Sequence, residues 1–436
     1  MVDKESKIPS HRLARIGQFA SLATRIGGNV VAEGTKQWLA GNRPHAKDLL
    51  LTPANLSRVA DQLAHLRGAA MKVGQMLSMD SGDLLSPELA DVLARLRSDA
   101  NPMLAKQLDK SLVEGLGTDW KRHFLSFNFK PVASASIGQV HKAYTDDGDQ
   151  VAVKVQYPGI RNSIDSDIDN VATLLNLVGV IPKDIDFTAL LEQAKLQLHA
   201  EANYQLESQY LNQYKQYLAT NSHFIVPRVF PAMTSKTVLT MEFVEGDKIE
   251  SLVNAPQHLR DNVMHHLFEL FFAELFEFKL VQTDPNFANY LYNHQQEKIV
   301  LLDFGATRMY SDTISEGYRL AFRAAIENDT QGIEQALRQI GFFSQTIVEK
   351  QKLAIIDLVT LACEPMGIDQ TYDFGVSDLA NKIRQRGSAL SFQENYWHTP
   401  PIDAIFLHRK IAGLYLLAAR LKAKINIHSL VIKHLY

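Results

Sequence analysis

The chain has one cysteine, Cys363, among its 436 residues. A single cysteine excludes an intrachain disulfide and a zinc site built from a cysteine cluster, and it is typical of a reducing compartment. Basic residues are not in excess, because 45 lysines and arginines stand against 48 acidic residues. A net charge of −3 gives no broad basic surface, so nucleic acid is not expected as the main partner.

Long apolar runs are also missing. No stretch approaches the roughly 18 apolar residues that a membrane span needs, and the N-terminus lacks the basic start and apolar segment of a secretory signal. These absences predict a cytoplasmic protein. With 46% hydrophobic residues the chain can bury a large core, and its length predicts two or three subdomains.

Residues 1–50 form a locally basic segment, with eight lysines and arginines against four acidic residues. Apolar residues recur in it at helical spacing from Leu13 to Ile26. Two interpretations are open. The segment is either an amphipathic helix that lies on an anionic membrane surface, or a helix packed on the protein body with its charges in solvent.

The chain does contain polar residues suited to phosphoryl transfer. Asp284 is followed five residues later by Asn289, and after a polar turn at residues 293–297 an apolar stretch runs into Asp303-Phe304-Gly305, 14 residues beyond Asn289. Transfer from ATP needs a carboxylate to orient or deprotonate the acceptor hydroxyl, and an amide oxygen with a second carboxylate to hold Mg²⁺. Asp284 fits the catalytic role, and Asn289 and Asp303 fit the metal-binding roles.

An upstream loop carries alanines where kinases have glycines. Strand and turn patterns over residues 131–156 surround a stretch that corresponds to the kinase nucleotide loop, Gly-x-Gly-x-x-Gly-x-Val. Alanine restricts the backbone, so we expect a stiffer loop and an altered nucleotide preference or turnover. The alternative is a plain hairpin loop. The residues expected to contact the nucleotide are Ala133, Ala135, Ser136, Gly138 and Val140.

Two lysines and two glutamates are candidates for catalytic ion pairs. Lys154, in Val-Ala-Val-Lys, is placed to reach the phosphates, and a kinase helix supplies a glutamate that fixes this lysine. A polar helix predicted within residues 187–216 carries Glu201 and Glu207, which helical rotation turns to different faces. We therefore expect Glu207 to pair with Lys154 and Glu201 with Lys72. Considered alone, Lys72 also fits a snorkelling side chain on an apolar helix.

The following segments predict a connector and then a helical region. A strand over residues 237–241 ends in Glu242-Phe-Val244-Glu-Gly246, where backbone groups from Glu242 to Val244 would meet adenine between two lobes. An apolar helix is predicted from His258 to Leu280. The chain after Arg308 is predicted to be helical, with helices at Ile314–Ile340, Thr346–Cys363 and Ile405–Lys424.

The helix predicted at Ile405–Lys424 combines an apolar stretch with basic residues. Two interpretations are open, a packed helix with a solvated basic side or a surface that faces lipid. The basic residues are His408, Arg409, Lys410, Arg420, Lys422 and Lys424.

Taken in order along the chain, these motifs resemble those of the UbiB/AarF atypical kinase-like family, most closely its coenzyme Q accessory branch. The resemblance covers nearly the whole chain from Lys7 onward. The motifs that carry it are Lys72-x-Gly74-Gln75, the loop at Ala133–Val140, Lys154-Val-Gln-Tyr-Pro-Gly159, Glu201 with Glu207, Gln282-Thr-Asp-Pro-Asn286 and Leu302-Asp-Phe-Gly-Ala-Thr-Arg308.

The resemblance implies an α+β, bilobal protein-kinase-like fold, preceded by a helical extension whose Lys-x-Gly-Gln motif covers the site and obstructs peptide substrates. It divides the chain into the extension (1–118), an N-lobe (119–245) and a helical C-lobe (246–436). It also implies ATP and Mg²⁺ binding, ATPase or unorthodox kinase activity, peripheral membrane association and support of ubiquinone biosynthesis. By position, Lys72, Lys154, Glu201, Glu207, Asp284, Asn289 and Asp303 match the family's functional residues.

The sequence departs from the family pattern at two points. Asn203 stands where the family usually has an acidic residue, and the C-terminal transmembrane helices of many bacterial members are missing. No Ala-Pro-Glu follows Asp303, and helical sequence begins soon after Arg308. Peptide phosphorylation is therefore not expected, and the mode of membrane attachment stays open.

Three functions compete. The first is an ATPase or a small-molecule or lipid kinase of quinone biosynthesis on the inner face of a membrane, with anionic phospholipid or a phenolic quinone precursor as a partner. The second is a non-catalytic, nucleotide-gated scaffold for quinone-biosynthesis enzymes. The third, a kinase of the aminoglycoside or choline type, shares Asp-x-x-x-x-Asn but does not account for Lys72-x-Gly-Gln. The sequence leaves a homodimer open.

Overall fold

The computed structural model describes residues 66, 68–70, 72–73, 102–177, 188–343, 347–392 and 401–436. The basic segment at residues 1–50 and the Gly74-Gln75 half of the Lys-x-Gly-Gln motif lie outside the described residues. The chain forms two compact units. Unit 1 comprises Met1–Gln209 and Arg228–Phe243, and unit 2 comprises Tyr210–Pro227 and Val244–Tyr436.

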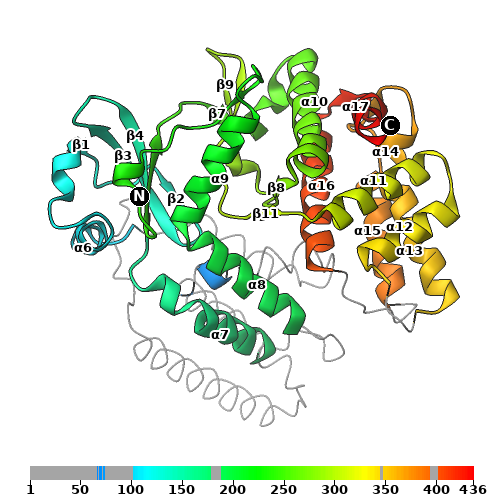
Figure 1. Ribbon diagram of the computed structural model, residues 1–436, viewed down its shortest axis with the longest axis horizontal. Helices are drawn as coiled ribbons and strands as arrows, with labels where there is room; N and C mark the ends of the chain where they lie inside the picture. The colour runs from blue at the N-terminus through cyan, green and yellow to red at the C-terminus, as the bar shows by residue number, and fades with distance from the viewer. Residues whose placement is uncertain are drawn as a thin grey trace, which may run out of the picture. The chain divides into compact units, whose positions relative to one another are not determined.

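Unit 1 contains an antiparallel sheet in the order β1-β3-β4-β6, with β2 paired to β3 (Figure 1). The predicted strand at residues 150–156 is confirmed as β4, and its β-branched residues are buried. Val140 pairs with Lys154, which sets the register between the alanine-rich loop and the lysine strand. The strands are β1 (Phe124–Phe127), β2 (Ala133–Ser134), β3 (Gly138–Thr145), β4 (Gln150–Gln156) and β6 (Val238–Glu242).

Helices α7 and α8 pack against each other in unit 1, side by side in Figure 1. The prediction of one helix over residues 187–216 is wrong, because the chain breaks between α8 and α9. The side chain of Asn203 accepts a hydrogen bond from the backbone N–H of Leu206, as a helix N-cap does. Glu201 and Glu207 therefore lie on separate helices. The helices are α6 (Ala105–Leu116), α7 (Ile164–Leu177), α8 (Thr188–Glu201) and α9 (Tyr204–Tyr217), whose last turns belong to unit 2.

Unit 2 is built around a β-hairpin. Asn293 of β9 pairs with Lys298 of β10, and Glu297 in the connecting turn has a left-handed backbone, so the predicted polar turn is confirmed. Strand β5 lies parallel to β10 on its other side. The strands of unit 2 are β5 (Phe224–Ile225), β7 (Asp247–Lys248), β8 (Leu280–Gln282), β9 (Tyr290–Asn293), β10 (Lys298–Leu301), β11 (Thr307–Met309), β12 (Tyr372–Asp373) and β13 (Lys424–Ile425).

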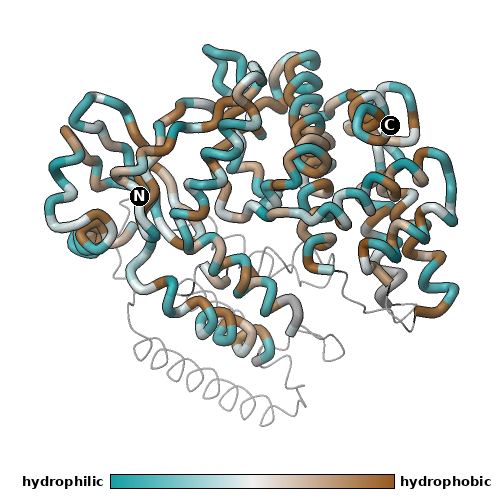
Figure 2. Tube along the Cα trace, in the orientation of Figure 1, coloured by the Kyte–Doolittle hydropathy of each residue, from teal (hydrophilic) through white to brown (hydrophobic). Residues whose placement is uncertain are grey.

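The central helix of unit 2 is α10 (Gln257–Ala273). Val263, Leu267 and Phe271 recur every fourth position on a buried face of this helix, and Figure 2 shows brown segments along it. The prediction that this helix reaches Leu280 is wrong at its end. The helix widens into one π-helical turn, η6 (Glu274–Phe278), and Leu280 begins strand β8.

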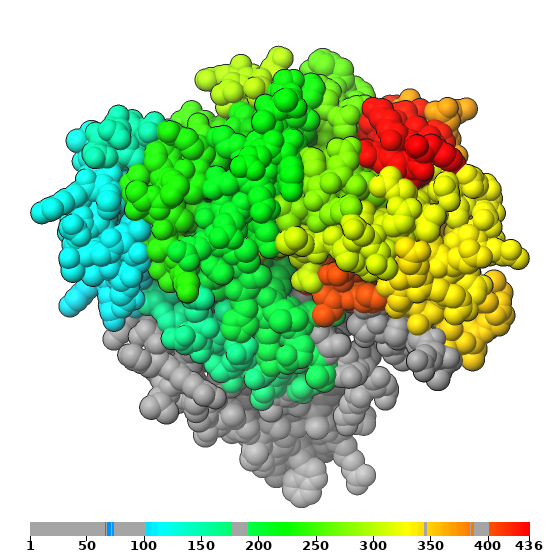
Figure 3. Space-filling model, viewed as in Figure 1, coloured from blue at the N-terminus to red at the C-terminus, as the bar shows by residue number. Residues whose placement is uncertain are grey.

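The remaining helices of unit 2 follow strand β11 in the chain. The predicted helix at Ile314–Ile340 is two helices, because Asn328 has a left-handed backbone and the side chain of Asp329 caps the second helix. Helices α16 and α17 pack on α10, and α17 lies at the surface in red in Figure 3. The helices are α11 (Asp312–Ile326), α12 (Thr330–Ile340), α13 (Glu349–Ala362), α14 (Glu364–Gly367), α15 (Leu379–Phe392), α16 (Ile402–Leu421) and α17 (Ile427–Leu435).

Among the helices of the described residues, none combines the length and the apolar character that a membrane span requires.

Candidate functional site

The Asp-x-x-x-x-Asn motif and the Asp-Phe-Gly segment are held together by the β9–β10 hairpin. Asn289 immediately precedes β9, and its carbonyl accepts a hydrogen bond of 3.0 Å from the backbone N–H of Leu302 after β10. The Asn289 side chain donates to Asp284 Oδ2 at 3.2 Å. Asp303 follows Leu302 directly. The three predicted residues Asp284, Asn289 and Asp303 therefore belong to one local structure within unit 2.

Short-range hydrogen bonds shape the turn that carries Asp284. The backbone N–H of Asn286 donates to Asp284 Oδ1 at 3.3 Å, and the Asn286 side chain accepts from Ala288 N–H at 3.2 Å. This cap begins the short 3₁₀ helix η7 (Phe287–Asn289). On α16, a Cβ at Gly413 would lie 2.6 Å from Pro285 Cβ. Glycine at this position thus permits close approach of α16 to the motif.

The donor atoms of this segment fit a hard divalent cation. Because the Nδ2–H of Asn289 donates to Asp284 Oδ2, the amide oxygen of Asn289 points to the other side and stays an acceptor. Asp303 contributes a half-buried carboxylate, whose Oδ1 also accepts from Gly305 N–H at 2.9 Å. Carboxylate and amide oxygens are suitable ligands for Mg²⁺. Asn289 and Asp303 therefore fit the predicted metal.

Lys154 in unit 1 has the predicted partner. Its Nζ donates to both carboxylate oxygens of Glu207, at 2.8 and 3.0 Å, and lies 5.1 Å from the centre of the Tyr204 ring. The lysine comes from β4 and the glutamate from α9. The side chain of Glu207 is fully buried, whereas that of Lys154 is 9% exposed. The predicted pairing of Lys154 with Glu207 is confirmed.

The second predicted ion pair is also present. Lys72 Nζ pairs with Glu201 Oε1, and Ser136 Oγ donates to Glu201 Oε2 at 2.8 Å. A Cβ at Gly68 would lie 3.0 Å from the carbonyl oxygen of Ser136. The helical residues around Lys72 therefore pack on the alanine-rich loop. Lys72 is 2% exposed and salt-bridged, so the interpretation as a snorkelling side chain is wrong.

The alanine-rich loop is a tight hairpin turn. Ala133 pairs with Val140, and the N–H of Ala135 donates to the carbonyl of Gly138 at 2.9 Å. A Cβ at Gly138 would lie 2.3 Å from the carbonyl oxygen of Val155 and 3.0 Å from the Tyr204 hydroxyl. Only glycine fits there, because a backbone oxygen cannot move aside easily. Gly138 occupies the last glycine position of the kinase pattern Gly-x-Gly-x-x-Gly-x-Val.

The predicted connector coincides with a boundary between the two units, at Phe243 and Val244. The N–H of Glu242 donates to the carbonyl of Arg228 at 2.8 Å, and that of Phe243 donates to Gln150 at 3.0 Å. These two N–H groups are engaged within unit 1. Contacts of Glu242 and Val244 with a nucleotide stay a prediction.

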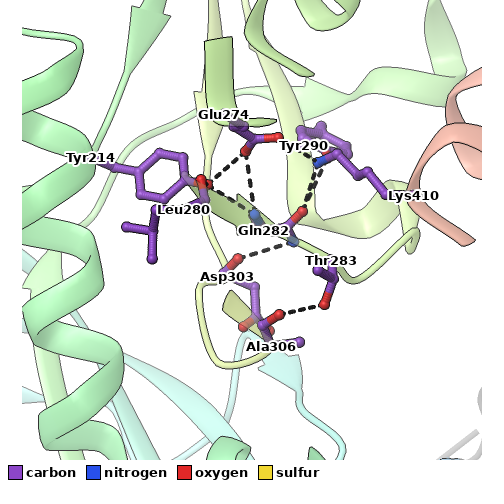
Figure 4. A network of polar contacts seen from close by, with 9 residues as sticks. All are labelled: Tyr214, Glu274, Leu280, Gln282, Thr283, Tyr290, Asp303, Ala306 and Lys410. Atoms are coloured by element: carbon purple, nitrogen blue, oxygen red, sulfur yellow. Dashed lines mark hydrogen bonds and ion pairs between the residues drawn. The ribbon is translucent and has the colours of Figure 1, made fainter. Parts of the chain in front are cut away.

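The sequence analysis did not identify a buried polar network beside Asp303. It joins residues from α9, η6, β8, β9 and α16 of unit 2 (Figure 4). Burial raises the pKa of Glu274, against the opposing effect of Lys410. Burial is the largest single influence on Lys410 and lowers its pKa, but Glu274 and Tyr290 together outweigh it, so the pKa is raised. The residues are Tyr214, Glu274, Gln282, Tyr290 and Lys410.

The interpretation of the helix predicted at Ile405–Lys424 as packed with a solvated basic side holds for Arg420, Lys422 and Lys424, which are exposed, but not for the basic residues nearer its start. Arg409 and Lys410 are 4% and 3% exposed, and burial lowers the pKa of His408 to about 4. These three residues face protein, whereas Arg420 pairs with Glu250 near the surface.

A family model for the ABC1 atypical kinase-like domain matches residues 95–337. The Saccharomyces cerevisiae protein named atypical kinase COQ8, mitochondrial, is 35% identical over 97% of this chain and 84% of its own length. The Rattus norvegicus protein named atypical kinase COQ8B, mitochondrial, is also 35% identical, over 97% and 80%.

Among solved structures, the complex of Rv3197 with erythromycin from Mycobacterium tuberculosis aligns with a TM-score of 0.60. It covers 85% of this chain and 93% of its own, at 24% identity, which supports the fold alone. The predicted α+β, bilobal kinase-like fold is confirmed. The division of the chain at residues 118 and 245 stays a prediction. The chain belongs to the ABC1 atypical kinase-like family.

Proposed function

We propose that this protein binds ATP with Mg²⁺ and acts as an ATPase or as a kinase of a small molecule or lipid. The observation that carries the proposal is the arrangement in unit 2. The amide N–H of Asn289 donates to Asp284, which leaves the amide oxygen for a cation, while the hairpin presents Asp303 two residues after the end of β10. Phosphoryl transfer requires this combination of a catalytic carboxylate and two oxygen ligands.

Each residue has a defined role in the proposal. Asp284 orients or deprotonates the acceptor hydroxyl or water, and Asn289 and Asp303 hold Mg²⁺. Bound Mg²⁺ would neutralise the charge that develops on the phosphates. Lys154 binds phosphate oxygens with its ammonium group, and Glu207 orients that group. The hairpin loop from Ala133 to Val140 supplies backbone contacts to the nucleotide.

Lys72 and Glu201 have a different role in the proposal. Their ion pair ties the helical residues around Lys72 to Ser136 of the nucleotide loop. A helix fixed on this loop would restrict the approach of a bulky polypeptide substrate, so the proposed acceptor is small or is water. The backbone of Val244 is proposed to contact adenine.

We further propose that the activity supports ubiquinone biosynthesis at a membrane surface. The relatives named COQ8 support this assignment by their names, which also place those proteins in mitochondria. The proposed partners are anionic phospholipid, a phenolic quinone precursor and the enzymes of quinone biosynthesis. The inner face of a membrane is the proposed location.

Purified protein should hydrolyse ATP only when Mg²⁺ is present, and faster with anionic liposomes than with neutral ones. Asp303→Asn should reduce turnover at least about 100-fold, because it removes one charged ligand of the cation. The control is Asp312→Asn, which changes an exposed carboxylate that pairs with Lys279 in the same unit. This control should keep wild-type turnover.

Turnover that Asp303→Asn leaves unchanged would contradict the metal assignment. A wild-type protein that is stabilised by ATP and Mg²⁺ but hydrolyses no nucleotide, with lipid and phenolic precursors present, would instead support the scaffold function. Thermal denaturation with and without nucleotide separates these outcomes, because a bound ligand raises the melting temperature.

A further inference from the structure

Five buried polar side chains meet beside the Asp-Phe-Gly segment (Figure 4). They come from segments that are far apart in the sequence, and all lie within unit 2. Burying so many polar groups is unfavourable unless they bind one another, so a network of this kind needs a reason. Its contacts with the segment that follows β10 indicate what that reason is.

Lys410 is the cation of the network. Its Nζ donates to the Tyr290 hydroxyl at 2.7 Å and to Gln282 Oε1 at 2.9 Å, and lies 3.6 Å from Glu274 Oε2. The side chains of Lys410 and Glu274 are 4% and 1% exposed. Two of the three contacts of the ammonium group are therefore with neutral side chains, and one of these neutral side chains is Gln282.

Gln282 connects this cation to the metal-binding segment. Its Oε1 accepts from Lys410, and its Nε2 donates to the backbone carbonyl of Asp303 at 3.2 Å. The amide orientation is set by the lysine, because an ammonium group can only donate and must face the amide oxygen. Lys410 thus directs the amide nitrogen of Gln282 toward Asp303.

Tyr214 holds the neighbouring residue. Its ring packs against the ring of Phe304, with centres 4.6 Å apart. Its hydroxyl lies 2.7 Å from Glu274 Oε1 and accepts from the backbone N–H of Gln282 at 2.9 Å. Packing of the Asp-Phe-Gly phenylalanine distinguishes active from inactive kinases. Here Tyr214 packs on this phenylalanine, and the Tyr214 hydroxyl is hydrogen-bonded to Glu274, the glutamate that faces Lys410.

The π-helical turn explains how Glu274 reaches this place. Glu274 is its first residue, and the turn leads through Lys279, with a left-handed backbone, into β8. This path brings Gln282 N–H to 3.4 Å from Glu274 Oε1. Single π-turns inside helices are frequent at functional sites.

We propose that Lys410 and Glu274 are positioning residues that hold the Asp-Phe-Gly segment in one conformation, through Gln282 to the Asp303 carbonyl and through Tyr214 to the Phe304 ring. The proposal rests on the proposed function, in which Asp303 holds Mg²⁺. Fixing the backbone at Asp303 fixes where its carboxylate points. Loss of the network should therefore raise the Mg²⁺ concentration that ATP hydrolysis needs, although no metal ligand is removed.

Two variants separate positioning from stability. Lys410→Met alone leaves Glu274 buried without its cation and is expected to destabilise the fold. The double variant Lys410→Met/Glu274→Met removes both charges at similar volume, which restores stability while the link to Gln282 stays broken. Gln282→Met keeps both charges of the pair and removes the bond to the Asp303 carbonyl, together with the bonds that Gln282 Oε1 accepts from Lys410 and Tyr290. Arg409→Met is the matched control, an equally buried cation on the same helix.

Two measurements apply to every variant. Hydrogen exchange followed by mass spectrometry reports on residues 299–309, with residues 150–156 of β4 as an internal reference. The Mg²⁺ concentration for half-maximal ATP hydrolysis reports on metal use. We expect the double variant and Gln282→Met to exchange at least about tenfold faster at 299–309 only, and to need about tenfold more Mg²⁺. Arg409→Met should match the wild type in both measurements.

The proposal is overturned if the double variant and Gln282→Met retain wild-type exchange at residues 299–309. It is also overturned if exchange at β4 rises equally, because the network would then serve stability alone. A wild-type protein without Mg²⁺-dependent hydrolysis would contradict the proposed function instead. The exchange measurement needs no nucleotide and still decides whether the network holds the segment.

Discussion

Both units bury a lysine beside a glutamate, but the two pairs are built differently. In unit 1, Lys154 binds both oxygens of Glu207 directly and is 9% exposed. In unit 2, Lys410 lies 3.6 Å from Glu274, is 4% exposed and bonds mainly to neutral side chains. The first lysine is held by a carboxylate, whereas the second is held mainly by neutral groups. Under the proposed function, the first pair binds a ligand directly and the second positions the residues that do.

The largest effect should come from breaking the pair in unit 1. Lys154→Met should lower ATP turnover about 100- to 1000-fold, because it removes a charge that the proposal places on the phosphates. It should also lower the free energy of unfolding by about 3 kcal/mol or more, because Glu207 is left buried without its partner. Steady-state kinetics and urea denaturation measure the two effects.

The double variant Lys154→Met/Glu207→Gln sharpens the comparison. Removing both charges should restore most of the lost stability but none of the turnover, since the ammonium group itself is needed. The Lys410→Met/Glu274→Met variant should instead keep turnover at high Mg²⁺ concentration. If the two double variants behave alike, the distinction between a ligand-binding lysine and a positioning lysine is wrong.

The next effect concerns Gly138, which begins β3 beside the strand that carries Lys154. Gly138→Ala should lower the free energy of unfolding by about 3 kcal/mol, because the new Cβ would lie 2.3 Å from a backbone oxygen. Gly148→Ala is the control in the same sheet. A Cβ at this position would meet no atom within 4 Å, so the only cost of the substitution is the strain of an alanine at a φ of 89°. This strain should lower the free energy of unfolding by about 1 kcal/mol. Equal losses in urea denaturation would contradict the close approach at Gly138.

The smallest effect is a pH dependence that the two units should share. Burial lowers the pKa of His141 in unit 1 and of His408 in unit 2 from 6.5 to about 4. The unfolded chain therefore binds a proton at a higher pH than the folded chain, so stability is lost as pH falls from about 6.5 toward 4. Each histidine should contribute about 2 kcal/mol of this loss between pH 7 and pH 5.

Urea denaturation of His141→Gln and His408→Gln at pH 7 and pH 5 tests this expectation. Each variant should lose less stability than the wild type on acidification. A variant whose loss equals that of the wild type would show that its histidine takes up a proton in the folded state, against the effect of burial.

The sequence was sufficient to predict the candidate site residues whose spacing follows from the requirements of phosphoryl transfer. Asp284, Asn289 and Asp303 lie close together in the chain, and a hairpin can be predicted from the polar turn between them. The pairing of Lys154 with Glu207 and of Lys72 with Glu201 was predictable from two lysines and two glutamates in known motifs, although the helix break at Asn203 was missed.

Contacts without a motif could not be predicted. Lys410 and Gln282 are 128 residues apart, and nothing in the local pattern of α16 separates a buried lysine from a solvated one. The π-turn at Glu274 was also missed, because helical periodicity continues through it to Phe278 and gives no sign of a changed hydrogen-bond pattern.

Nucleotide binding by titration calorimetry, with and without Mg²⁺, tests the central claim most directly. In the wild type, Mg²⁺ should tighten ATP binding. Asp303→Asn should abolish this tightening, whereas Lys154→Met should weaken binding both with and without Mg²⁺ and keep the tightening. Mg²⁺-dependent tightening that persists unchanged in Asp303→Asn would contradict the assignment of Asp303 as a metal ligand.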